Sequence, residues 1–170
     1  LGERTLEIEL LSAFDVTLSD ARADEAHPAF MNLFVRAEWQ PAQQALWFER
    51  KPRLPTEAAL RMAHFLADSD AQVVSVRVGA DRQRWLGRNR DASQPLADFD
   101  TPSATADAAQ ALDTGLDPVC AMAVRLRIAP LAKARLTFAT AASDHDGTLR
   151  AVIDKYRQPS HVQRASLMSA

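Results

Sequence analysis

A period-two alternation of apolar and polar residues runs through residues 4–18 and marks the first predicted element. It is typical of a half-buried antiparallel strand, which turns one face to a core and the other to water. Because such a strand is unusually long, we expect a bulge near Ser12. Polar residues 19–26 are predicted to form a loop, and Pro28 is suited to begin a short helical turn over 27–32. The apolar face of the predicted strand holds Leu6, Ile8, Leu10, Phe14, Val16 and Leu18.

The alternation returns over residues 33–39 and 44–50, on either side of a short turn at 40–43. Strand, short turn and strand indicate a β-hairpin. Trp39 and Trp47 lie close to the turn, where aromatic side chains on neighbouring strands pack favourably against each other.

Two further strand pairs follow. Residues 57–68 are compatible with a helix, but their alternation favours a strand that turns into a second one over 72–78. Residues 119–128 also alternate, and the proline-containing turn after them predicts a second hairpin with 133–141. Cys120 lies on the apolar face of its strand and is predicted to belong to the core.

The apolar period changes to that of a helix at Asp144. Ser143 or Asp144 is predicted to cap the helix, Pro159 to end it, and Ser160 to cap a second helix over 162–168. The apolar face of the first helix holds Leu149, Val152, Ile153 and Tyr156.

Many strands followed by helices predict a mainly β fold, an antiparallel β-sandwich with a C-terminal helical tail. The sandwich is expected over residues 1–143 and the tail over 144–170. Residues 91–114 are poor in large apolar side chains and are predicted to form a long polar loop. The start Leu1-Gly2-Glu3-Arg4 has no initiating methionine and leads directly into a strand, which suggests part of a longer protein.

Composition excludes several classes of function. The chain has 170 residues, enough for one domain, and a net charge of −2, which argues against nucleic acid as a partner. A single cysteine rules out an internal disulfide. The four histidines are scattered without the spacing of a metal site, and no nucleotide or serine-hydrolase motif is present. The sequence therefore predicts no metal, no cofactor and no catalytic residue.

The stretch most suited to recognition is 81–90, which carries four arginines, an aspartate, a tryptophan and a glycine. Guanidinium groups bind phosphate or carboxylate in a bidentate manner, and a tryptophan offers a flat face to a sugar ring. A structural interpretation competes with this one, in which Asp81 pairs with an arginine, Gly87 takes a positive φ and Trp85 fills the core. The candidate substrate- or interface-binding residues are Asp81, Arg82, Trp85 and Arg88.

Three local patterns occur in a family-like order: His27-Pro28-Ala29-Phe30 with Asn32-Leu33-Phe34, then Asp81-Arg82 with Trp85-Leu86-Gly87-Arg88, then Leu116-Asp117-Pro118. Together they resemble the β-sandwich region of glycoside hydrolase family 94, the cellobiose and cellodextrin phosphorylases. They resemble in particular the phosphorylase-like region of cyclic β-1,2-glucan synthases. The likeness extends from Arg4 to the helical tail.

This resemblance implies a galactose-mutarotase-like super-sandwich, of which the chain would be a part. The parent enzyme would synthesise or phosphorolyse β-glucosides with inverting chemistry, using β-glucan or glucooligosaccharide and phosphate. Its catalytic aspartate would lie in a helical barrel beyond this chain, so the sandwich would be inactive alone. It would support the active site, domain packing or a homodimer, at the cytoplasmic side of the bacterial inner membrane for a synthase parent.

An alternative hypothesis is a free-standing β-sandwich module that binds oligosaccharide on Trp39, Trp47 or Trp85. The two hypotheses differ in what they expect of the surface. A domain of a larger enzyme leaves apolar surface uncovered when alone, whereas a free-standing module exposes aromatic side chains to a sugar.

Overall fold

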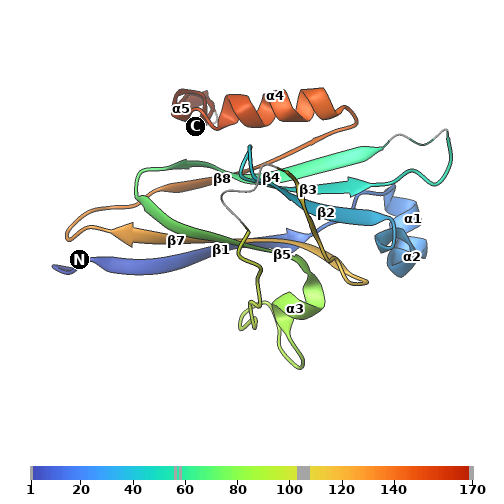
Figure 1. Cartoon of the computed structure of the whole chain (residues 1–170), viewed down its shortest axis with the longest axis horizontal. Coiled ribbons are helices and arrows are strands. Elements are labelled where there is room, and N and C mark those ends of the chain that lie inside the picture. The colour runs from blue at the N-terminus through green and yellow to red at the C-terminus, as the bar shows by residue number, and fades with distance from the viewer. Residues whose placement is uncertain (1, 56, 58, 103–107, 169–170) are drawn as a thin grey trace.

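The computed structural model describes residues 2–55, 57, 59–102 and 108–168 and shows two antiparallel sheets packed face to face (Figure 1). This confirms the predicted antiparallel β-sandwich. The smaller sheet has the strand order β1-β7-β5, formed by β1 (Leu6–Asp15), β7 (Pro118–Ile128) and β5 (Gln72–Asp81). The larger has the order β6-β2-β3-β4-β8, formed by β6 (Gln110–Leu112), β2 (Val35–Gln40), β3 (Ala45–Arg50), β4 (Leu60–Ser69) and β8 (Leu136–Ser143).

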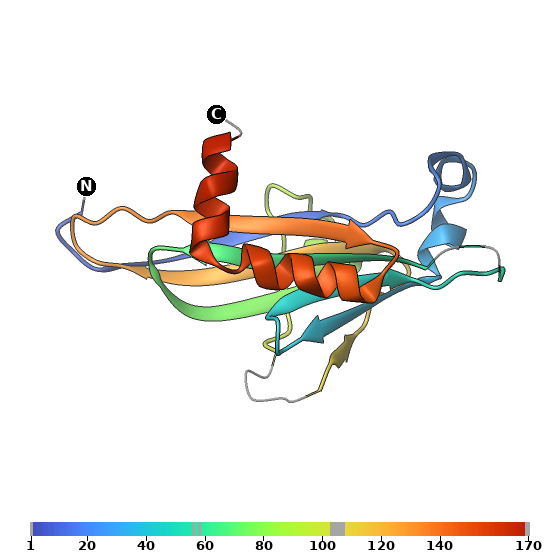
Figure 2. The ribbon, with the colours of Figure 1, turned by 90° about the horizontal axis from the view of Figure 1, so that it is seen from above.

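Helices cover the outer faces of both sheets. The helix α4 (Asp146–Tyr156) lies across the larger sheet, and α5 (Pro159–Met168) follows it in a crosswise direction and contacts β4 (Figure 2). The short helix α3 (Arg82–Leu86) lies against the smaller sheet on the opposite side of the molecule (Figure 1). The helices α1 (Ala21–Ala26) and α2 (Pro28–Asn32) lie together at one end of the sandwich.

Strand β7 is buried on both faces, which explains its unusual run of apolar and small residues. Every residue from Pro118 to Val124 is buried. Cys120, Met122 and Val124 point into the core between the sheets, so the prediction for Cys120 is confirmed. The alternate residues Val119, Ala121 and Ala123 pack under Trp85 and Phe99 on the outer face.

The two strand pairs predicted after the first hairpin contain real strands, but neither pair is a hairpin. Strands β4 and β5 belong to different sheets, as do β7 and β8. The predicted pairing of 119–128 with 133–141 is therefore wrong. Alternation fixes which face of a strand is buried, but it carries no information on whether the next strand stays in the same sheet.

The first strand is shorter and more regular than predicted. Its register with β7 runs without a break from Leu6 opposite Ile128 to Asp15 opposite Val119, so the bulge expected near Ser12 is absent. Val16 and Leu18 follow the strand and turn into the core between the sheets. That exit shortens the strand and removes the need for a bulge.

Residues 19–26 were predicted as a loop but contain α1. The Asp20 carboxylate accepts a hydrogen bond of 3.0 Å from the Arg22 backbone N–H and caps the helix. The turn predicted at Pro28 is confirmed, because Pro28 begins α2.

The caps predicted for the helical tail are wrong. His145 occupies the N-cap of α4, and the Ser143 hydroxyl instead accepts a bond of 3.0 Å from the His145 N–H. Pro159 begins α5 rather than only ending α4, so Ser160 lies inside the second helix. A proline at the first helical position explains this, because that position needs no N–H donor.

The predicted loop 91–114 is partly ordered against the sandwich. It contains β6, and Asp100 pairs with Val78 of β5 through two backbone hydrogen bonds of 2.9 Å. Phe99 is buried against the smaller sheet. Residues 103–107 of the predicted loop lie outside the described residues.

Candidate functional site

The three segments that carry the family likeness meet at one end of the sandwich. Polar side chains of these segments and of the neighbouring strand β1 gather there in a group that we call the motif corner, consisting of Asp15, Asn32, Asp81, Arg82 and Asp117. These residues come from β1, α2, β5, α3 and the loop before β7. More than a hundred residues of chain separate the first from the last, so only the fold brings them together.

Arg82 is the centre of the motif corner. Its guanidinium forms an ion pair with Asp15 and a second, at 2.8 Å from Nε to Oδ2, with Asp117. The second contact lacks the direction of a hydrogen bond from Nε. The bond to Asp15 is the main reason why the pKa of Arg82 is raised. Asn32 donates from Nδ2 to the other oxygen of Asp117 at 3.3 Å, which links α2 to the network.

Asp81 contributes as the cap of α3 rather than as the partner of an arginine. Its Oδ1 accepts bonds from the backbone N–H groups of Gln83 at 2.7 Å and Arg84 at 3.4 Å. Gly115 packs directly on this carboxylate, because a Cβ there would lie 2.8 Å from Asp81 Cγ. Gly115 also has φ +56°, a second reason for glycine at this position.

Trp85 lies on the other side of α3 and faces the core. Its side chain is 7% exposed and packs on small residues of β7. Gly87 ends the helix with φ +74°, as the structural interpretation predicted. Arg84 is held by Asp98 at 3.2 Å and by both oxygens of Asp100, at 3.1 and 3.3 Å.

Arg88 is the candidate that the fold leaves outside the motif corner. It is exposed after Gly87, and within the described residues its side chain has no hydrogen bond or ion pair. Of the four candidates, two therefore join the motif corner, one is buried and one is free within the described part of the chain.

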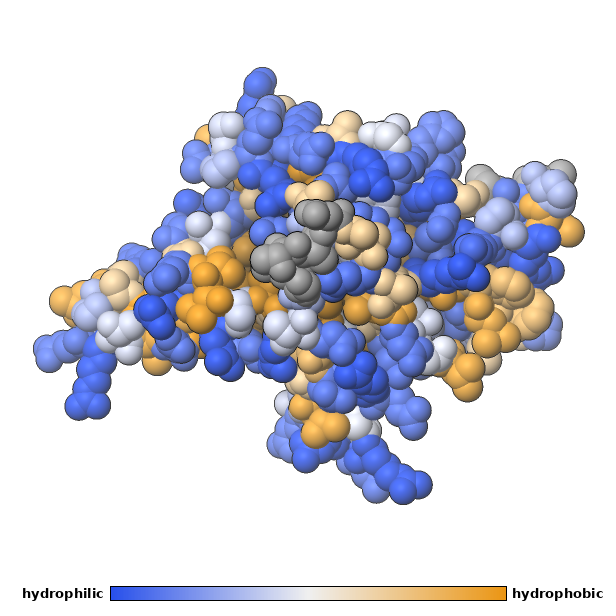
Figure 3. Space-filling model, in the orientation of Figure 1, coloured by the Kyte–Doolittle hydropathy of each residue, from blue (hydrophilic) through white to orange (hydrophobic). Residues whose placement is uncertain are grey.

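Large apolar side chains surround the motif corner and are exposed. Figure 3 shows hydrophobic surface gathered at the end of the molecule where α2 lies. The Arg53 guanidinium lies over the Phe30 and Phe34 rings at 5.1 and 5.7 Å. The exposed residues on the corner segments and the neighbouring loop are Phe30 (46%), Leu33 (57%), Leu54 (55%) and Leu116 (75%).

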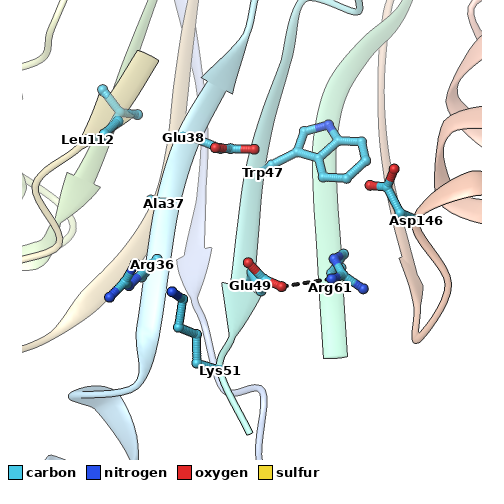
Figure 4. Close-up of a pocket in the computed structure, with 10 residues that line it drawn as sticks. Arg36, Ala37, Glu38, Trp47, Glu49, Lys51, Arg61, Leu112 and Asp146 are labelled. Carbon is cyan, nitrogen blue, oxygen red and sulfur yellow. Dashed lines mark hydrogen bonds and ion pairs between the residues drawn. The ribbon is translucent and has the colours of Figure 1, made fainter. Parts of the chain in front are cut away.

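A second polar site lies on the outer face of the larger sheet, beside the area that α4 covers (Figure 4). We call this site the sheet groove, and it was not predicted from the sequence. Its signal was visible in the alternation of polar residues on the outward face of two strands. The side chains that line it include Arg36, Glu38, Trp47, Glu49, Lys51, Arg61 and Asp146.

The tryptophans of the alternative hypothesis expose almost none of their surface. Trp39 lies between the sheets and is 4% exposed, and Trp47 lies under α4 and is also 4% exposed. The Arg150 guanidinium lies 4.8 Å from the centre of the Trp47 ring and covers it. None of the three tryptophans offers an open face on which a sugar ring could stack.

Among the described residues, no group of three or more histidine, cysteine or acidic side chains could hold a metal ion. No helix in the described part of the chain is long and apolar enough to cross a membrane.

Comparison with known proteins identifies the family. Residues 1–159 match the family described as glycosyl hydrolase 94, supersandwich domain. The cyclic beta-(1,2)-glucan synthase NdvB of Rhizobium meliloti is 32% identical over 153 residues, which cover 89% of this chain. The same match spans 5% of the length of that synthase. The chain therefore belongs to the supersandwich domain family of glycosyl hydrolase 94.

Proposed function

We propose that this chain is a non-catalytic supersandwich domain of a larger enzyme that synthesises or phosphorolyses β-glucan. In that enzyme it packs against a helical-barrel catalytic domain through the motif corner and the apolar residues around it. Family membership and the similarity to a small part of a cyclic β-(1,2)-glucan synthase support this proposal.

The observation that carries the proposal is the contrast between polar and apolar groups at the motif corner. Arg82 is engaged with both Asp15 and Asp117, so the single guanidinium of the motif corner already has carboxylate partners within the chain. Four large apolar side chains nearby remain exposed. A surface whose guanidinium at the motif corner is already paired and whose apolar groups are uncovered is suited to a protein interface rather than to binding a free anion.

The tail 144–170 would connect the sandwich of 1–143 with the catalytic domain. Leu149 and Ile153 fix α4 to the larger sheet, because both are fully buried. Leu167 and Met168 near the end of α5 are 81% and 80% exposed. Apolar residues at that position are suited to a contact with a following domain.

By analogy with the synthase that this chain resembles, the substrates of the parent would be β-1,2-glucan chains with phosphate. The domain would work at the cytoplasmic side of the bacterial inner membrane. Packing of the motif corner against a second copy of the parent, rather than against its own barrel, is the other form that the proposed interface can take.

The proposal can be tested in a full-length enzyme that carries this domain. The double variant Leu33→Gln and Leu116→Gln places polar groups in the apolar surface at the motif corner. We expect glucan synthesis to fall about tenfold or more and limited proteolysis between the domains to accelerate, since an interface loses several kcal/mol when central apolar anchors are made polar. Light scattering separates loss of a dimer from loosening of the domains.

The matched control is Leu131→Gln, a leucine 69% exposed on the connection between β7 and β8, at the opposite end of the sandwich. It should leave synthesis and proteolysis unchanged. Normal synthesis by the corner variant, with normal assembly, would show that the motif corner is not an interface.

A further inference from the structure

The sheet groove is built on a rigid grid of side chains from three adjacent strands. Arg36, Glu49 and Arg61 lie opposite one another on β2, β3 and β4 and form one row. Glu38 and Trp47 lie opposite each other in the next row. Strands stand about 4.8 Å apart and the rows about 6.7 Å apart, so the side chains form a regular grid with several polar groups within reach of one small ligand.

The formal charges of the sheet groove cancel. Arg36, Lys51 and Arg61 supply three cations, and three carboxylates come from Glu38, Glu49 and Asp146. An anion or a cation entering this groove would meet as much repulsion as attraction. A neutral polyhydroxylated ligand is different, because each hydroxyl group can donate to a carboxylate and accept from a guanidinium or ammonium group.

Several donors in the sheet groove have no partner within the described residues. Arg36 and Lys51 are exposed and make no side-chain hydrogen bond or ion pair there. Trp47 is 4% exposed, and its buried indole Nε1 also has no hydrogen-bond partner there. Because the indole Nε1 is closed to solvent, the donors that a ligand in the groove can reach are those of Arg36 and Lys51.

Other groups in the sheet groove are held in place by neighbours. Arg61 Nη2 donates to Glu49 at 2.8 Å, and Asp146 accepts from Arg150 Nε at 2.8 Å. Figure 4 shows the Trp47 ring lying between Glu38 and Asp146, with the paired Glu49 and Arg61 beside it. The cavity measures about 560 Å³, within the range of small-ligand sites.

We propose that the sheet groove is a non-catalytic binding site for a neutral β-linked glucooligosaccharide. Glu38 and Glu49 accept hydrogen bonds from sugar hydroxyl groups, Arg36 and Lys51 donate to sugar oxygens, and the Trp47 ring lines the groove beside them. The identity of the sugar rests on the proposed function, whereas the preference for a neutral polyol rests on the balance of charges in the groove. The site would hold a growing or product glucan chain near the catalytic domain.

The experiment is a titration of the 170-residue chain with linear β-1,2-glucooligosaccharides, followed by the indole N–H resonances in a ¹⁵N-resolved NMR spectrum. A Trp47→Phe variant identifies the Trp47 resonance. We expect that resonance to shift saturably at millimolar sugar, and the Trp39 and Trp85 resonances to stay in place. Glu38→Gln should weaken binding about tenfold, because a hydrogen bond to a charged group is lost.

Two controls make the titration decisive. Arg36→Gln, on the exposed end of the grid, provides a second variant that should weaken binding even if Glu38→Gln disturbs folding. Arg88→Ala changes an exposed arginine outside the groove and should leave the affinity unchanged. Inorganic phosphate should leave the Trp47 resonance unmoved.

A Trp47 resonance that does not move with sugar, or that moves with phosphate at lower concentration, would overturn the proposal. Equal affinity in the wild-type chain and both groove variants would also overturn it. The titration is independent of catalysis and of the motif corner, so its failure is distinguishable from failure of the proposed interface, which is measured as synthesis by the full-length enzyme.

Discussion

His64 is a titratable residue in the core between the two sheets. Its ring stacks on Phe138, with centroids 5.5 Å apart, and meets the edge of Phe14 at 5.2 Å. Nδ1 lies 2.9 Å from the Thr140 hydroxyl, while Nε2 is buried without a hydrogen-bond partner in the described residues. Burial lowers the pKa of His64 from 6.5 to about 4, so the ring is neutral in the folded protein at pH 7.

This environment predicts a loss of stability in mild acid. Above pH 6.5 His64 is neutral in both the folded and the unfolded chain, and its contribution is fully present. As the pH falls from 6.5 towards 4, the unfolded chain binds a proton that the folded chain does not, so unfolding becomes easier. We expect this residue to account for a decrease of roughly 3 kcal/mol in the free energy of unfolding, measured by urea titration across that range.

His64→Gln should reduce the pH dependence of the unfolding free energy, because the amide cannot titrate and can still bond to Thr140. The control His145→Gln changes an exposed histidine and should keep the pH dependence of the wild-type chain. Parallel curves for the wild type and His64→Gln would contradict the assignment.

At the same scale, residues 81–90 show which properties of a side chain can be predicted from the sequence and which cannot. The positive φ of Gly87 and the burial of Trp85 agree with the structural one of the two interpretations that the sequence left open. The partners of Arg82 and Arg84 were not predictable, because Asp15 and Asp100 lie in distant or irregular segments. A dense cluster of arginines indicates that they bind acidic groups. Only the tertiary structure shows whether those groups belong to the same chain or to a ligand.

At the scale of elements, the contact between β5 and the loop after α3 depends on a missing side chain. Phe99 is 8% exposed and lies on Gly79, where a Cβ would come within 2.6 Å of the Phe99 ring. The Arg77 guanidinium lies 5.5 Å from the centre of the same ring. The loop therefore packs against the smaller sheet at Gly79, where the absence of a side chain leaves room for the Phe99 ring.

Gly79→Ala should therefore displace Phe99 and lower the free energy of unfolding by about 1–3 kcal/mol, the usual cost of overpacking a well-filled site. The test is a double-mutant cycle with Phe99→Ala, measured by urea unfolding. In the Phe99→Ala background the added methyl group has room, so Gly79→Ala should cost much less. Equal costs in the two backgrounds would exclude the contact as the cause.

Sequence patterns predicted the strands better than their pairing. The first hairpin, β2 with β3, was confirmed. The connection after β4 is even shorter, yet it carries the chain from one sheet to the other, so the length of a turn does not decide the pairing. The sheet groove was not predicted either. It forms only because β2, β3 and β4 are neighbours in the sheet, and the sequence of a single strand does not reveal its neighbours.

For the whole molecule, Cys120 offers a probe of global stability. It is the single cysteine of the chain and lies fully buried near the start of β7, the central strand of the smaller sheet. Burial raises the pKa of its thiol far above the usual range, which disfavours the reactive thiolate. Both surfaces around it are covered, by the larger sheet on one side and by α3 with its loop on the other.

We expect a thiol reagent to label Cys120 in the native chain at least about a thousandfold more slowly than in the unfolded chain, since labelling requires the sandwich to open. The rate should rise with urea in parallel with the unfolded fraction measured by tryptophan fluorescence. Rapid labelling in native buffer would mean that β7 is accessible and that the described packing is wrong.

The pairing of β1 with β7 has a consequence for how the protein is made. The two strands are joined residue by residue, yet roughly a hundred residues lie between them in the chain. At a ribosome that adds about 5–20 residues per second, β1 waits several seconds before its partner emerges. During that delay β1 has no partner strand, and its apolar residues Leu6, Leu10 and Leu11 stay unpaired. A chaperone that binds nascent chains would therefore have a long time to act on β1.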